Sequence, residues 1–93
     1  MKTIILTQET CPQCDSLKMF LFAATKNQFE DNITYVQKEA EPDLFASLVA
    51  KSGVTQTPSL LFIEEDSNDI LEIISGFNPS RTKSRLEQYY LKK

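Results

Sequence analysis

The sequence has no histidine and no tryptophan, and only two glycines and two cysteines among its 93 residues. Without histidine it lacks the usual general base near neutral pH and the commonest nitrogen ligand for metals. The N-terminus is followed by a single short apolar run, Ile4–Leu6, which is too short for a signal-peptide core or a membrane span. Ten basic against thirteen acidic residues leave a net charge of −3, without the basic surface that nucleic acids require. We therefore expect a cytoplasmic protein that binds neither membranes nor nucleic acids.

The composition is that of an ordinary globular chain, with 41% hydrophobic and 25% charged residues. A chain of this length cannot build two independent cores. It also contains no internal repeat, low-complexity tract or flexible linker. We expect one domain over residues 1–93, acting as a monomer.

The hydrophobic pattern predicts alternating strands and helices. Short runs rich in apolar, branched or aromatic residues predict strands over residues 3–7, 33–37, 59–63 and 70–74. The acidic stretch 64–69 joins the last two of these as a solvated hairpin loop.

Three helices complete the predicted order βαβαββα. The first covers residues 12–27, with its apolar positions at helical spacing: Leu17, Phe20, Leu21 and Ala24. Pro42 opens the second helix and Gly53 ends it, with one apolar face formed by Leu44, Phe45, Leu48 and Val49. Asn78 and Pro79 open the third helix, whose apolar stripe is Leu86, Tyr89 and Tyr90.

The two cysteines are close together, as Cys11-Pro12-Gln13-Cys14, and therefore cannot staple distant parts of the chain. On the first turn of a helix, thiols three positions apart lie close enough to form a disulfide. Cys11 should lie at the helix N-terminus, where unpaired N–H groups and the helix dipole favour thiolate over thiol. We therefore predict a thiol-disulfide oxidoreductase in which Cys11 attacks the substrate disulfide and the more buried Cys14 resolves the mixed disulfide.

Two other interpretations of the cysteine pair are weaker. Zinc normally takes four ligands, and the chain has no further cysteine and no histidine. Two inert cysteines would not explain the placement of the pair directly after a strand and at the start of a helix. We therefore assign no metal to the chain, and thiol chemistry requires no dissociable cofactor.

Three segments together resemble the glutaredoxin family: Thr10-Cys11-Pro12-Gln13-Cys14, then Thr57-Pro58, then Ser75-Gly76-Phe77-Asn78-Pro79. The resemblance spans nearly the whole chain. It implies an α/β, thioredoxin-like fold with a four-stranded mixed sheet of order 2-1-3-4 and three helices. It also implies that Pro58 is cis beside the cysteines, and that the substrate is bound by Thr10, Pro12, Gln13, Thr57, Pro58, Gly76 and Phe77.

The resemblance is uneven where glutathione would bind. Members that use glutathione often carry a lysine three residues before the first cysteine, where this chain has Gln8, and acidic residues where it has Asn78 and Pro79. Gln13 and the segment 75–77 instead resemble redoxins that donate electrons to ribonucleotide reductase and are recharged by thioredoxin reductase. The expected partners are thus a disulfide-containing protein, with ribonucleotide reductase as the candidate, and either thioredoxin reductase or glutathione as electron source.

Two alternative functions stay open at this point. Two chains could share an iron-sulfur cluster through Cys11, with glutathione completing the ligands as in some glutaredoxins. The chain could also be an interaction domain that keeps the fold without turnover, although its dithiol is intact.

Several surface residues allow two interpretations. Phe77 either presents an apolar edge to partners or belongs to the core. Three cations gather at the start of the last helix, where the dipole disfavours them, and they form either a solvated face or a steering site for an acidic partner: Arg81, Lys83 and Arg85. The acidic residues on and beside the hairpin loop, Glu72 included, are expected to be solvated.

Overall fold

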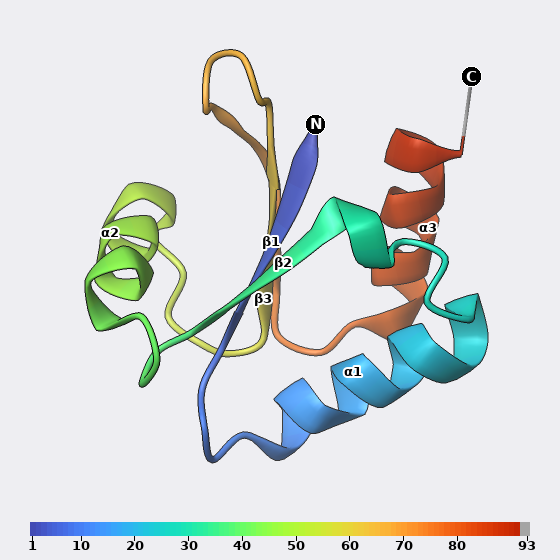
Figure 1. Ribbon diagram of the computed structural model, residues 1–93, viewed down its shortest axis with the longest axis horizontal. Helices are drawn as coiled ribbons and strands as arrows, with labels where there is room; N and C mark the ends of the chain where they lie inside the picture. The colour runs from blue at the N-terminus through green and yellow to red at the C-terminus, as the bar shows by residue number, and fades with distance from the viewer. Residues whose placement is uncertain (92–93) are drawn as a thin grey trace.

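A four-stranded sheet separates two unequal layers of helices in the computed structural model, which describes residues 1–91 (Figure 1). The elements are β1 (Lys2–Thr7), α1 (Pro12–Thr25), the 3-10 helix η1 (Glu30–Asn32), β2 (Ile33–Gln37), α2 (Pro42–Ser52), β3 (Ser59–Ile63), β4 (Ile70–Ser75) and α3 (Pro79–Tyr90). The strand order is β2-β1-β3-β4, with β1 parallel to β2 and all other neighbours antiparallel. The predicted topology is therefore confirmed. No helix in the described chain is long and apolar enough to cross a membrane.

The sheet has a separate core on each face, because successive strand side chains point to opposite sides. Ile5 faces α1 and α3, whereas its neighbours Ile4 and Leu6 face α2. The helices α1 and α3 contribute fully buried side chains to their core, such as Leu17 and Leu86. The helix α2 contributes no buried residue to the opposite core.

The first helix ends two residues before the predicted boundary. Lys26 and Asn27 both adopt the left-handed conformation, and their amides donate to the carbonyl of Leu21. This capping pattern ends a helix even without glycine, which is why the apolar periodicity did not reveal it. Ala24, expected in the core, is exposed, whereas Thr25 is buried and donates its hydroxyl to the Leu21 carbonyl.

The other two helices begin where the sequence predicted. The second runs to Ser52 and is capped by Gly53 in the left-handed conformation, with φ at +77°. Its expected apolar face is only partly covered, because Leu44 is 46% exposed. The third helix is capped by the side chain of Asn78, which accepts a hydrogen bond from the Arg81 amide at 3.1 Å.

Glu72 is not a solvated residue of the hairpin, so that prediction is wrong. Its carboxylate accepts hydrogen bonds from Arg81 at 3.0 Å, from Arg85 at 2.8 Å and from the Tyr89 hydroxyl at 2.8 Å. Burial alone would raise the pKa of Glu72, but these hydrogen bonds outweigh it and lower the pKa. Two of the three cations on α3 are thus paired with β4, and Lys83 stays exposed.

Candidate active site

The cysteine pair lies where β1 delivers the chain to the start of α1. Cys11 caps the helix, and the backbone amide of Cys14 donates to the Cys11 sulfur at 3.1 Å. The two residues form a disulfide, with their Cα atoms 5.2 Å apart. The predicted placement at a helix N-terminus, with the sulfurs within bonding reach, is therefore confirmed.

The two cysteines differ in exposure in the predicted direction, with Cys11 at 7% and Cys14 at 2%. Cys11 is nevertheless far less exposed than a freely accessible nucleophile would be. Its sulfur is bonded to Cys14, and the loop before β3 places the Thr57 hydroxyl 3.5 Å from it. Pro12 and Gln13 are exposed beside the disulfide.

Two further loops meet at the disulfide. The Thr57–Pro58 peptide bond is cis, as the family resemblance implies. The carbonyl of Pro58 accepts a hydrogen bond from the Gly76 amide at 2.8 Å, which ties this loop to the one that follows β4. Gly76 has φ at +78°, and a Cβ there would lie 3.2 Å from the Gln56 Oε1 atom. Both its backbone conformation and its close contact therefore favour glycine.

The structure brings most of the predicted substrate-binding residues to one edge of the sheet. Thr57 contacts the disulfide, and Pro58 joins Gly76 through the backbone. Phe77 follows directly and is 37% exposed, which favours the apolar edge over the core interpretation. Thr10 is exposed on the loop that leads to Cys11. Substrate binding by these residues stays a prediction.

A cleft of about 390 Å³ adjoins the disulfide and was not predicted from the sequence. Its floor is apolar, formed by Phe45 and Val49 of α2 and by the buried Val54. Its rim is polar, formed by Gln8, Lys38, Thr55, Gln56 and Thr57. The parallel pairing of β1 with β2 was the available signal, because it makes residues 8 and 38 leave the sheet at the same edge.

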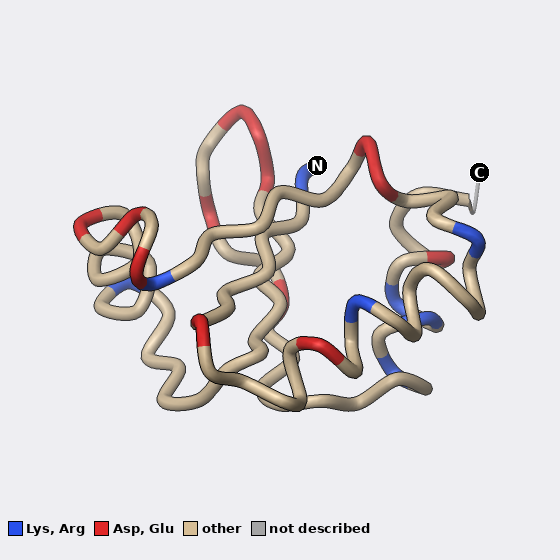
Figure 2. The backbone as a smooth tube through the Cα atoms, turned by 60° about the horizontal axis from the view of Figure 1, so that its bottom comes forward, with Lys and Arg blue, Asp and Glu red and all other residues tan. Residues whose placement is uncertain are grey.

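Carboxylates outnumber cations around this edge. The Glu9 amide donates to the carboxylate of Glu39 at 2.8 Å, and Asp15 directly follows Cys14 in the first turn of α1. Acidic residues also mark the start of α2, whereas cations gather on the side of α1 and α3 (Figure 2). Within residues 1–91, no three His, Cys, Asp or Glu side chains are grouped to hold a metal ion.

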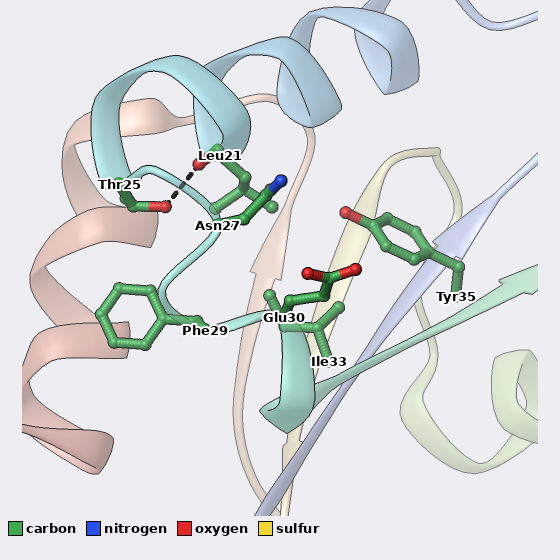
Figure 3. A pocket seen from close by; sticks show the side chains of 7 residues that line it. All are labelled: Leu21, Thr25, Asn27, Phe29, Glu30, Ile33 and Tyr35. Carbon is green, nitrogen blue, oxygen red and sulfur yellow. Dashed lines mark hydrogen bonds between the residues drawn. The ribbon is translucent and has the colours of Figure 1, made fainter.

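A second hollow, of about 90 Å³, lies at the opposite end of α1 (Figure 3). It is bounded by Leu21 and Thr25 of the helix, by Glu30 and by Tyr35 of β2. Burial, and to a smaller extent the Glu30 charge, raises the pKa of Tyr35. This hollow shares no lining residue with the cleft beside Thr57.

Comparison with protein-family models and with curated protein sequences gives no match. Solved structures do match. The thioredoxin of Aeropyrum pernix superposes with a TM-score of 0.70 at 24% identity, over 96% of this chain and 74% of its own. The thioredoxin of Trypanosoma brucei brucei superposes with a TM-score of 0.71 at 18% identity, over 99% of this chain and 75% of its own. Chlamydomonas reinhardtii thioredoxin f2 superposes with a TM-score of 0.72 at 10% identity, over 98% of this chain and 80% of its own. The chain therefore has a thioredoxin-like fold, and these matches to thioredoxins give no support for the glutaredoxin family in particular.

Proposed function

We propose that the protein is a cytoplasmic thiol-disulfide oxidoreductase that reduces protein disulfides through Cys11 and Cys14. The observation that supports this most directly is the position of the Cys11 sulfur. It caps α1, accepts the Cys14 amide at 3.1 Å and lies 3.5 Å from the Thr57 hydroxyl. When the disulfide is reduced, both groups can donate to a thiolate on Cys11, in addition to the favourable helix dipole.

The proposed reaction has two exchange steps. The Cys11 thiolate attacks one sulfur of the substrate disulfide, which forms a mixed disulfide and releases the other substrate sulfur as a thiolate. The Cys14 thiolate then attacks the Cys11 sulfur, which releases the second substrate thiolate and closes the Cys11–Cys14 disulfide. Two electrons pass from the protein to the substrate, and the structure corresponds to the oxidised product.

Recharging requires an external dithiol or two monothiols to reduce the Cys11–Cys14 disulfide. We propose thioredoxin reductase as the first candidate and glutathione as the second. Gln8 supports this order, because it is uncharged and lies where members of the glutaredoxin family that use glutathione often carry a lysine. Ribonucleotide reductase is the candidate substrate, on the resemblance of Gln13 and segment 75–77 to redoxins that serve it. Purified reductase systems supplied with NADPH, whose consumption is followed by absorbance, distinguish the two electron sources.

The order of attack is tested by trapping covalent intermediates. Cys14→Ser leaves Cys11 able to attack but removes the resolving thiol, so mixed disulfides with protein substrates should accumulate on non-reducing gels. The wild-type protein should release the same substrates reduced. The matched control is Cys11→Ser, which should trap nothing and lose turnover by at least three orders of magnitude.

Trapping by Cys11→Ser instead of Cys14→Ser would reverse the two assigned roles. Turnover that persists in both single variants would reject the dithiol mechanism altogether.

A further inference from the structure

The cleft beside the disulfide has the features of a site for a substrate side chain. Its volume of about 390 Å³ falls in the range of about 300–1,000 Å³ that is usual for ligand sites. Thr57 connects it to the reactive centre, because this residue lines the cleft and its hydroxyl lies 3.5 Å from the Cys11 sulfur. A group that binds at this end of the cleft is therefore separated from the disulfide by the Thr57 side chain.

Polar side chains provide most of the cleft lining, and three apolar side chains form its floor. Phe45 and Val49 are half-buried, and Val54 is 7% exposed. Water against these side chains is released when an apolar group covers them, which favours binding in proportion to the area covered. The floor thus selects for an aliphatic or aromatic side chain.

The rim of the cleft favours a negative charge on the substrate, more weakly than the floor favours an apolar side chain. Lys38 is the one charged residue that lines the cleft, and the structure gives it no ion pair within residues 1–91. Nearby Glu39 does not neutralise it by direct contact, since its carboxylate accepts the Glu9 amide. A carboxylate on the substrate, beyond the apolar group, would reach Lys38 without displacing another partner.

We propose that the cleft binds the substrate polypeptide next to its disulfide, with a bulky apolar side chain on Phe45, Val49 and Val54 and an acidic residue beyond it at Lys38. This inference rests on the proposed oxidoreductase function and names its substrate class. Glutathione lacks an apolar side chain, so it leaves the floor of the cleft uncovered. The class is therefore an apolar-acidic protein segment rather than a small thiol.

Short peptides carrying one cysteine as a mixed disulfide with thionitrobenzoate test the apolar preference. The reduced protein attacks the peptide sulfur and releases coloured thionitrobenzoate, and Cys14 then frees the peptide thiol. A peptide with leucine beside the cysteine, on one of its two sides, should react about tenfold faster than the all-glycine peptide at limiting concentration. The proposal would be overturned if the peptide with leucine before the cysteine and the peptide with leucine after it both reacted at the rate of the all-glycine peptide.

Two variants of α2 locate the preference in the cleft. Val49→Thr keeps the shape of the side chain and adds a hydroxyl, so it should reduce the leucine preference to about threefold. Leu44→Thr makes a comparable change on the same helix at an exposed position outside the cleft, and it should leave the preference unchanged. A preference that both variants reduce equally, or that neither reduces, would place the apolar site elsewhere.

The charge preference is tested by pairing the substrate with the lysine. Two leucine peptides are compared that carry either aspartate or lysine at the position two residues from the cysteine. The rate for the aspartate peptide divided by the rate for the lysine peptide is measured with the wild type and with Lys38→Gln. The ratio should fall about threefold in the variant, and comparing ratios removes the general field of the surrounding carboxylates. An unchanged ratio would exclude Lys38 as the acceptor of the acidic residue.

The same assay gives a different result if the proposed oxidoreductase function is wrong. If the protein released thionitrobenzoate but stayed as a peptide adduct, without closing the Cys11–Cys14 disulfide, the dithiol mechanism itself would be wrong. Rapid closure at the same rate for every peptide would leave the oxidoreductase intact and remove only the substrate class.

Discussion

The two faces of the sheet are covered to different degrees. The α1 and α3 face has a core to which both helices contribute fully buried side chains, and Leu17 and Leu86 there are 0% exposed. The α2 face has a core built by the strands and Val54, and the helix adds only half-buried side chains such as Leu48. Packing is therefore concentrated under the helix that carries the cysteines.

The well-covered face supports the reactive cysteine, whereas the less covered face is open to a ligand. The position of Cys11 depends on α1, and a densely packed helix keeps its N–H groups aimed at the sulfur. The cleft lies on the other face, where the incomplete cover by α2 leaves Phe45 and Val49 open to a ligand. The reactive group therefore lies on the helix with the more completely buried core, and the cleft adjoins the less completely covered one.

The largest expected effect comes from the same truncation on the two faces. Leu17→Ala should lower the free energy of unfolding by about 3 kcal/mol, because it leaves a cavity in a fully buried core. Leu48→Ala should cost about 1 kcal/mol, because its side chain is already partly exposed. Urea denaturation of the oxidised proteins measures both values. Equal losses would show that α2 is as tightly packed as α1.

An intermediate effect is expected from the ionic contacts that join α3 to β4. Glu72→Gln should lower the free energy of unfolding by about 1 to 2 kcal/mol at pH 7, since the charges of Arg81 and Arg85 lose their partner. Asp66→Asn, in the exposed hairpin loop, is the matched control and should change stability by less than about 0.5 kcal/mol.

The same contacts predict a pH dependence with a defined sign. Because the folded-state pKa of Glu72 lies below its ordinary value of 4.5, the stabilisation is complete above that pH and is lost as the pH falls through the lowered pKa. The stabilities of wild type and Glu72→Gln should therefore converge in acid. A gap that stays constant down to pH 3 would mean that the carboxylate charge is not the stabilising element.

The smallest effect is expected on the α2 face. Lys51 donates to the Asn68 carbonyl at 2.6 Å, which is the contact between the end of α2 and the hairpin loop. Lys51→Met keeps the aliphatic stem and should cost no more than about 0.5 kcal/mol, because the bond is exposed to solvent. A loss greater than that of Glu72→Gln would reverse the order of the two faces.

The sequence predicted the strands and helices because their signals are local, whereas the strand order followed from the family resemblance. The boundaries of β2 and β3 follow from short apolar or branched runs, and Gly53 and Asn78 mark helix ends through their own chemistry. The end of α1 was misplaced because Lys26 and Asn27 adopt the left-handed conformation without glycine. The 3-10 turn η1 was missed, since its three polar residues carry no periodicity.

The reactive pair and the loops beside it were predictable, whereas the cleft and the role of Glu72 were not. Cys11 and Cys14 are recognised by spacing, and their helix position follows from the preceding strand. The role of Glu72 depends on Arg81, Arg85 and Tyr89, which approach it only after β4 and α3 pack together. The cleft likewise needs three separate segments to meet, so no single stretch of sequence contains it.

The hairpin loop between β3 and β4 lies at the far end of the sheet from the cysteines (Figure 1). One strand of five residues separates it from Pro58, a span of about 17 Å. Asp66 at its tip is exposed and makes no contact with the reactive edge. This loop is thus the place to tether the protein to a sensor chip, since an anchor there leaves the disulfide facing the solution.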